Sequence, residues 1–188
     1  MTILSGSVYD YVVMILPRLP GNYFEIGVFN GGGFARIARE NPDKKCFAVD
    51  PFLEDGNTIG NSGKDTGSRL VEQKQNFLHN TQDLNNVTLY EMTSAEYAQQ
   101  LTNQQCKDMN ISLVTIDGNH HYPHVTIDFD IAVRLIGDRA GQIIVDDTHV
   151  DDVSRAFGEF LEKFKHRIER EVPAGGSTKV ILIKANDE

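Results

Sequence analysis

The sequence predicts an α/β domain built on an open, mostly parallel β-sheet, and three observations support this fold class. Short apolar runs alternate along the chain with amphipathic helical segments, which is the pattern of a sheet covered by helices. Near the start, a strand enters a glycine-rich turn with a helical run directly behind it, at Asn22–Phe34. The chain closes with a pattern typical of an antiparallel hairpin, which adds strands of opposite direction to the sheet.

The first half of the chain supplies the elements around this glycine turn. A first helix is closed by Pro17 and Pro20, and the helix behind the turn ends before Asn41, because Pro42 disfavours a helical residue in front of it. The polar stretch Leu53–Ser68 has no apolar periodicity and predicts a long loop that closes over a ligand. The expected elements of this half are Ser5–Leu16, Phe34–Glu40, Lys45–Asp50, Arg69–Leu78, Val87–Glu91 and a short helix beginning near Ala95.

The second half predicts two more strands that end in acids, two amphipathic helices and the closing hairpin. The first of these helices carries Val125, Phe129 and Ile136 on one face by their spacing of three to four residues. The expected elements are the strands Ile111–Asp117 and Gln142–Asp147, a helix from Val153 to Phe164, and strands Arg167–Val172 and Lys179–Lys184 around a turn at Pro173–Gly176. We find no internal repeat, so residues 1–188 are predicted to form one domain.

Composition and charge exclude several classes of partner. The net charge of −9 argues against a nucleic-acid backbone or an anionic membrane, because both reward clustered Lys and Arg. No apolar run approaches membrane-spanning length, and the N-terminus lacks the basic region of a signal peptide. Cys46 and Cys106 form no spaced pattern, which suits free thiols in a reducing compartment. We therefore expect a soluble cytoplasmic protein.

The glycine turn predicts a nucleotide-type binding site. Its glycines let the backbone adopt positive φ and let a ligand approach without a Cβ in the way. The N-terminus of the following helix offers unpaired N–H groups to that ligand. The spacing Glu25-x-Gly27-x-x-x-Gly31-x-Gly33 differs from the dinucleotide fingerprint, because Phe29 stands where that fingerprint needs its second glycine. An ordinary tight turn between a strand and a helix is the alternative.

Four aspartates fall at the ends of predicted parallel strands, which is the ligand edge of an open α/β sheet. Asp50 can accept hydrogen bonds from both ribose hydroxyls of an adenosine, the alternative being a turn aspartate. Asp117, Asp146 and Asp147 would converge from two strands and need a cation to stay charged. Ligation by oxygen alone favours a hard divalent ion such as Mg²⁺, and the alternative is that Asp147 caps the next turn and Asp117 caps the following helix.

A histidine-rich segment follows the fourth strand and raises the question of zinc. His120 and His124 are four residues apart and could share a helical face, but Pro123 between them is tolerated only at a helix start. No His-Glu-x-x-His motif or cysteine pair supports zinc. The preferred interpretation is a polar rim of the pocket, with zinc or iron as the alternative.

Taken together, these motifs resemble class I S-adenosylmethionine-dependent methyltransferases of the macrocin O-methyltransferase and cephalosporin-hydroxylase-like group, which is related to catechol O-methyltransferase. Three blocks carry the resemblance: Phe24–Gly33, Val49–Phe52, and Ile116–Tyr122 with a helix and then Ile144–Asp147. It covers nearly the whole chain from about residue 20. It implies a Rossmann-like, doubly wound, mostly parallel sheet of seven strands in the order 3-2-1-4-5-7-6, with the last strand antiparallel.

The resemblance also implies roles for individual residues. Glu25, Gly27, Asn30 and Gly31 would bind the methionine end of S-adenosylmethionine, Asp50 its ribose and Ser94 its adenine, with Asp117 also at the cofactor. Asp117, Asp146 and Asp147 would hold Mg²⁺, which orients a substrate hydroxyl and lowers its pKa for methyl transfer. Asp117 and His120 would be the catalytic residues.

The chain departs from this group at one position, where Asp117-Gly-Asn119-His120 replaces Asp-Gly-Asp-His. The second acid is the suspected general base of the group, and a neutral amide has no useful basicity. We expect His120 to take the proton instead, with loss of the proton from a metal-acidified hydroxyl to water as the alternative. The expected function is Mg²⁺-assisted O-methylation of a small hydroxylated molecule such as a sugar.

Two other functions are left open by the sequence. Asn119 favours a protein of the same fold that binds the cofactor without transferring its methyl group. A nicotinamide-dependent oxidoreductase is disfavoured by Phe29 in the glycine turn. We expect no nucleic-acid or membrane partner, and the oligomeric state is left open, a homodimer included.

Overall fold

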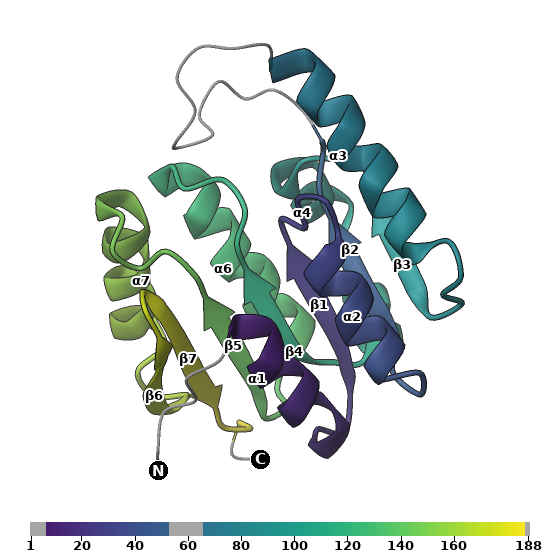
Figure 1. Cartoon of the computed structure of the whole chain (residues 1–188). Helices are drawn as coiled ribbons and strands as arrows, with labels where there is room; N and C mark the ends of the chain where they lie inside the picture. Colours follow the sequence, from purple (N-terminus) through teal and green to yellow (C-terminus); the bar gives the residue numbers. More distant parts are fainter. Residues whose placement is uncertain (1–6, 53–65, 187–188) are drawn as a thin grey trace.

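The computed structural model describes residues 7–52 and 66–186, which fold around one central β-sheet. The sheet has seven strands in the order β3-β2-β1-β4-β5-β7-β6 (Figure 1). Strands β1 to β5 pair in parallel, whereas β7 pairs antiparallel with both β5 and β6. This order and these directions confirm the predicted fold class.

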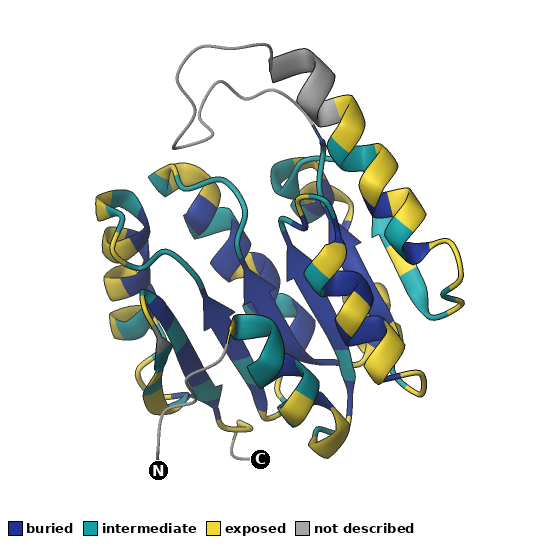
Figure 2. Ribbon diagram, viewed as in Figure 1, coloured by how far each residue is buried: buried dark blue, intermediate teal, exposed yellow. Residues whose placement is uncertain are grey.

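The strands place the carboxyl ends of the parallel pairs along one edge of the sheet, where the predicted acids follow. Their bounds are β1 (Asn22–Ile26), β2 (Cys46–Val49), β3 (Val87–Tyr90), β4 (Ile111–Ile116), β5 (Gly141–Val145), β6 (Ile168–Gly175) and β7 (Thr178–Ile183). The central strands are buried along their length because helices cover both faces (Figure 2).

Two sets of helices cover the two faces of the sheet. One face packs against α1 (Val8–Ile15), which runs into the short 3₁₀ helix η1 (Leu16–Arg18), and against α2 (Gly32–Glu40) and α3 (Thr66–Thr81). The other face packs against α4 (Ser94–Gln100), α5 (Asn103–Met109), α6 (Tyr122–Ile136) and α7 (Asp151–Lys163). No helix in the described part of the chain has the length and apolar character needed to cross a membrane.

The structure corrects three predicted elements. Helix α3 begins at Thr66, inside the predicted loop, and continues to Thr81. Helix α5 was not predicted, although Thr102 and Gln105 form a capping box that marks its start. Strand β6 continues through the predicted turn and pairs Pro173 with Lys179, which an edge strand tolerates because the missing N–H need not be bonded. Residues 53–65 of the predicted closing loop lie outside the described residues, so that loop stays a prediction.

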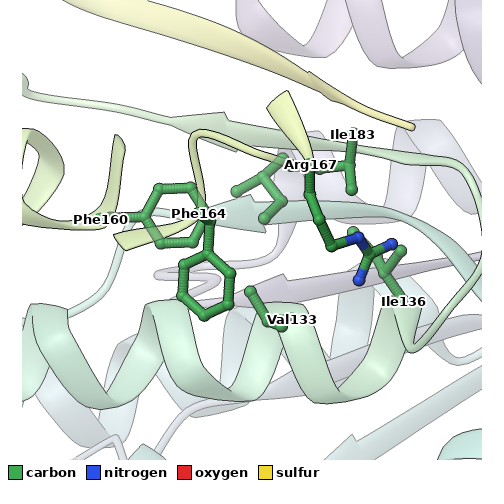
Figure 3. A pocket seen from close by; sticks show the side chains of 7 residues that line it. Val133, Ile136, Phe160, Phe164, Arg167 and Ile183 are labelled. Carbon is green, nitrogen blue, oxygen red and sulfur yellow. The ribbon is translucent and has the colours of Figure 1, made fainter. Parts of the chain in front are cut away.

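A small apolar pocket lies on the α6–α7 face, away from the acids (Figure 3). Phe160 and Phe164 line it side by side, with ring centroids 5.0 Å apart. It also contacts Ile183, which pairs with the first residue of β5, so the pocket lies at the edge opposite the strand carboxyl ends. Arg167 also lines the pocket, and its guanidinium donates to the carbonyl oxygens of Gly137, Arg139 and Lys184.

Candidate active site

The glycine turn after β1 has the left-handed backbone that its sequence predicts. Gly27 has a φ of 83° and Gly31, the N-cap of α2, has a φ of 72°. A Cβ at Gly27 would lie 2.1 Å from the carbonyl oxygen of Asp117, and one at Gly31 would lie 2.4 Å from the ring of Phe77. These two glycines are therefore required by the close approach of β4 and α3. The amide oxygen of Asn30 accepts a hydrogen bond from the Gly32 N–H at 3.1 Å and supports the start of α2.

Glu25 is a fully buried acid on the central strand β1. Its Oε2 accepts a hydrogen bond from the Tyr23 hydroxyl at 2.7 Å, and that hydroxyl also lies 2.9 Å from Thr115 Oγ1. Oε1 is buried without a hydrogen-bond partner. Burial raises the pKa of Glu25 to about 8, with smaller increases from Asp117 and Asp50. A cationic group bound beside Glu25 would favour its ionised form.

Asp50, at the end of β2, bonds to the protein's own backbone. Its Oδ2 accepts from the N–H groups of Val28 and Phe29, at 2.9 and 3.3 Å, and its Oδ1 accepts from the Phe52 N–H at 2.8 Å. Asp50 therefore holds the glycine turn against the β2 end, as the turn-aspartate interpretation expected. The predicted contact of Asp50 with a ribose stays a prediction.

The ends of β4 and β5 bring two acids and one histidine together. Asp117, His120 and Asp147 offer potential metal-ligand atoms that all lie within 4.8 Å of one another. His120 Nε2 lies 3.4 Å from Asp147 Oδ2 and 3.9 Å from Asp117 Oδ1, and it is buried without a hydrogen-bond partner. Asp147 has a left-handed backbone with a φ of 52°, which is uncommon outside glycine and typical of functional sites.

The charges of this group act on one another. Burial raises the pKa of Asp117, and the nearby Asp146 and Asp147 raise it further, while His120 opposes the increase. The Asp117 carboxylate raises the pKa of His120, with a further increase from Asp147, and burial opposes both. A bound cation would offset the repulsion among the carboxylates.

Asp146 is not a member of the group of three, although the sequence predicts it as a metal ligand beside Asp147. Its Oδ1 accepts hydrogen bonds from the Thr178 hydroxyl at 2.6 Å and from the Asp147 N–H at 2.9 Å. His120 takes the third place in the group, so the role of Asp146 stays a prediction. His121 and Val150 are the N-caps of α6 and α7, and neither cap makes a side-chain hydrogen bond, so Asp117 does not cap α6 as the alternative expected. The alternative that Asp147 caps the next turn stays a prediction.

The histidine-rich segment does not form the helical pair that the zinc alternative would use. His120 precedes α6 and points toward the acids, whereas His124 is exposed within the first turn of α6 and is not part of the group of three. Asn119, which replaces the usual acid, accepts a hydrogen bond at Oδ1 from the His121 N–H at 2.8 Å. Its amide therefore supports the turn into α6.

Sequence reasoning missed two residues near the site. Asp128 on α6 is 1% exposed, and neither of its carboxylate oxygens has a hydrogen-bond partner. Burial raises its pKa to about 7, which the neighbouring Ser94, the first residue of α4, and His120 partly oppose. Its position three residues after Val125 places it on the buried face of α6, which is the signal that could have identified it. The second residue is Tyr9 on α1, for which spacing gives no signal.

Comparisons with known proteins agree with this geometry. A family model described as "Methyltransferase domain" matches residues 24–148, which is more than half of the chain. No curated protein sequence matches the chain.

Three solved structures illustrate the shared fold. A Staphylococcus aureus structure described as a caffeoyl-CoA O-methyltransferase superposes with a TM-score of 0.68 at 15% identity, covering 98% of this chain and 86% of its own. CalS11, a TDP-rhamnose 3′-O-methyltransferase of calicheamicin biosynthesis, gives 0.63 at 17%, covering 93% and 76%. The Podospora anserina methyltransferase PaMTH1, solved with S-adenosylhomocysteine, gives 0.61 at 13%, covering 95% and 78%. At these identities the likeness establishes the fold alone.

Proposed function

The chain belongs to the methyltransferase-domain family of S-adenosylmethionine-dependent enzymes, and on that premise we propose that it methylates a hydroxyl oxygen of a small molecule. The observation that carries this proposal is the group of Asp117, His120 and Asp147 beside the glycine turn. Acids and an imidazole that face one another can hold a divalent cation and accept a hydroxyl proton in the same place. A sugar is the favoured acceptor, in keeping with the structural likeness to the TDP-rhamnose 3′-O-methyltransferase CalS11.

The residues around the glycine turn fit a cofactor that carries positive charge. Glu25 Oε1 is buried without a partner, and a sulfonium or ammonium group nearby would supply the missing electrostatic partner. Asp50 stands at the end of β2, where an acid binds a ribose in sheets of this kind. We assign Glu25, Gly27, Asn30 and Gly31 to the amino-acid side of the cofactor, and Asp50 and Ser94 to its adenosine.

Two members of this group, Asp117 and Asp147, would hold a hard divalent cation, because their carboxylate oxygens are the ligands that Mg²⁺ prefers. When bound, S-adenosylmethionine would supply an electrophilic methyl group, and Mg²⁺ would lower the pKa of a coordinated hydroxyl. The contribution of Asp117 and Asp147 would then be mainly positioning.

We assign the acceptance of the hydroxyl proton to His120 Nε2. This atom lies 3.4 Å from Asp147 Oδ2 and 3.9 Å from Asp117 Oδ1, and it has no hydrogen-bond partner among the described residues. Asn119 cannot serve, because its amide is not basic and its oxygen is bonded to the His121 N–H.

Calorimetric titration with S-adenosylhomocysteine, with and without Mg²⁺, tests this function. The wild-type chain should bind S-adenosylhomocysteine, and radiolabelled methyl transfer to a panel of nucleotide sugars and phenols should stop when Mg²⁺ is chelated. Asp147→Asn should bind S-adenosylhomocysteine as the wild type does and lose the response to Mg²⁺.

The alternatives give different results in the same experiment. Binding of S-adenosylhomocysteine without transfer to any acceptor would favour a non-catalytic protein of the same fold. Asn119 is the sequence feature that supports this alternative. Binding of NAD without S-adenosylhomocysteine would refute the proposed function. Transfer that persists with chelator would remove the metal from it.

A further inference from the structure

Tyr9 of helix α1 lies over the glycine turn, and its hydroxyl has no hydrogen bond within the described chain. A Cβ on Gly33 would lie 2.3 Å from the Tyr9 ring carbons Cε1 and Cζ, so the ring rests on the first turn of α2. Cζ carries the hydroxyl, which is therefore held close to this turn. Within the described chain this hydroxyl makes no hydrogen bond, whereas Tyr11 on the same helix donates to Gln142 at 2.8 Å.

Helix α1 holds Tyr9 in a fixed position. Ser7 caps the helix with a complete capping box, and Val12 is buried against the sheet together with Leu16 that follows. Asp10 also forms an ion pair with Arg36 of α2 at 2.7 Å. The half-buried Tyr9 ring is thus presented by a packed helix at the edge of the site.

The acids of the site act electrostatically on the Tyr9 hydroxyl that the contact with Gly33 holds beside the glycine turn. Glu25 raises the pKa of Tyr9 most, burial adds to this, and Asp117 and Asp146 contribute further. The phenol therefore stays protonated at neutral pH and is available as a hydrogen-bond donor. These three acids belong to β1 and to the ends of β4 and β5.

The strand order relates this position to the cofactor. Asp50 follows β2, and β4 and β5 lie on the opposite side of β1. A cofactor with its ribose at Asp50 would extend across β1, and its amino-acid end would reach the side of the sheet where Tyr9 lies. This end carries a carboxylate, which needs hydrogen-bond donors in a region rich in acids.

We propose that the Tyr9 hydroxyl donates a hydrogen bond to the amino-acid carboxylate of the bound cofactor. This assignment rests on the proposed function, because it requires an S-adenosylmethionine-type ligand at the glycine turn. The assignment makes α1 part of the cofactor site. It also explains why position 33 is a glycine, since a side chain there would displace the Tyr9 ring.

Two ligands and two variants test the proposal. Tyr9→Phe keeps the ring on Gly33 and removes only the hydroxyl, while Tyr11→Phe is the matched control on the same helix. We titrate each full-length protein calorimetrically with S-adenosylhomocysteine and with 5′-methylthioadenosine, which lacks the amino-acid end. Tyr9→Phe should weaken S-adenosylhomocysteine binding about 10- to 100-fold, the loss expected for a hydrogen bond to a charged group. Its binding of 5′-methylthioadenosine, and both affinities of Tyr11→Phe, should match the wild type.

Each other outcome overturns the assignment in a distinguishable way. Equal losses for both ligands would place the effect on the adenosine side or on the fold. Wild-type affinity in Tyr9→Phe, with or without a lower turnover, would remove Tyr9 from the carboxylate. A Tyr11→Phe loss equal to that of Tyr9→Phe would assign the effect to helix α1. Failure of the wild-type chain to bind S-adenosylhomocysteine would refute the proposed function together with this assignment.

Discussion

Two corners of the same sheet edge use aspartate in opposite ways. At the β2 corner, Asp50 accepts hydrogen bonds from the backbone N–H groups of Val28, Phe29 and Phe52. At the β4–β5 corner, Asp117 and Asp147 face each other and His120, whose Nε2 has no hydrogen-bond partner. An acid bonded to several N–H groups is stabilised in its charged form, whereas two acids that face each other are destabilised until a cation joins them.

This difference indicates a structural role for the β2 corner and a catalytic role for the β4–β5 corner. The β2 corner is already satisfied by the protein and holds the glycine turn in place. At the β4–β5 corner the carboxylates repel each other, and Asp147 has a left-handed backbone. Such unfavourable features persist only when the surrounding fold imposes them. We therefore expect loss of rate from changes at the β4–β5 corner and loss of stability or affinity from changes at the β2 corner.

The largest expected effect is at the β4–β5 corner. His120→Ala should lower the rate of methyl transfer about 10²–10⁴-fold, the usual contribution of a general base, with S-adenosylhomocysteine still bound. His124→Ala, an exposed neighbour on α6, is the matched control and should keep the wild-type rate. Single-turnover transfer of a radiolabelled methyl group measures both. An unchanged rate in His120→Ala would mean that this corner does not hold the base.

A second prediction concerns Glu25, which lies on β1 between the two corners. Its Oε2 accepts a hydrogen bond from Tyr23, and its Oε1 has no hydrogen-bond partner. Its folded-state pKa of about 8 lies above the unfolded value, so its contribution to stability is full at low pH. That contribution is lost as the pH rises from the unfolded pKa to about 8. Glu25→Gln removes this dependence and should gain on the order of 2–4 kcal/mol relative to the wild type between pH 5 and 8.

Denaturant unfolding of both proteins across this pH range measures the difference in the free energy of unfolding. A difference that stays constant with pH would show that Glu25 is charged in the folded state. Tyr23→Phe, which removes the donor to Oε2, should raise the pKa of Glu25 further and serves as a control of direction.

The smallest expected effect is at the β2 corner. Asp50→Ala removes the acceptor of three backbone N–H groups and should lower the free energy of unfolding by about 1–3 kcal/mol. It should also weaken S-adenosylhomocysteine binding by about 1.5–3 kcal/mol, through loss of charge-assisted bonds to the ribose. Asp50→Asn keeps one acceptor oxygen and should lose less stability. Loss of stability with unchanged affinity would make Asp50 a structural support only.

The sequence by itself determined the fold class and which edge of the sheet carries the acids. Apolar periodicity sets which residues form strands, and parallel strands place their carboxyl ends together, so Asp50, Asp117 and Asp147 were expected at one edge. The positive φ at Gly27 and Gly31 also followed from the glycine pattern, and both are observed. The strand order came from resemblance, since many topologies are compatible with the same alternation of strands and helices.

Only the tertiary structure decided which of these acids face one another. Asp146 and Asp147 are adjacent in sequence, yet Thr178 of β7 bonds to the first and leaves the second beside His120. Tyr9 joins the site because α1 packs beside α2, a contact that no local pattern encodes. A periodic pattern assigns a residue to a face or an edge, whereas the direction of its side chain depends on partners distant in the chain and on backbone angles that those partners impose.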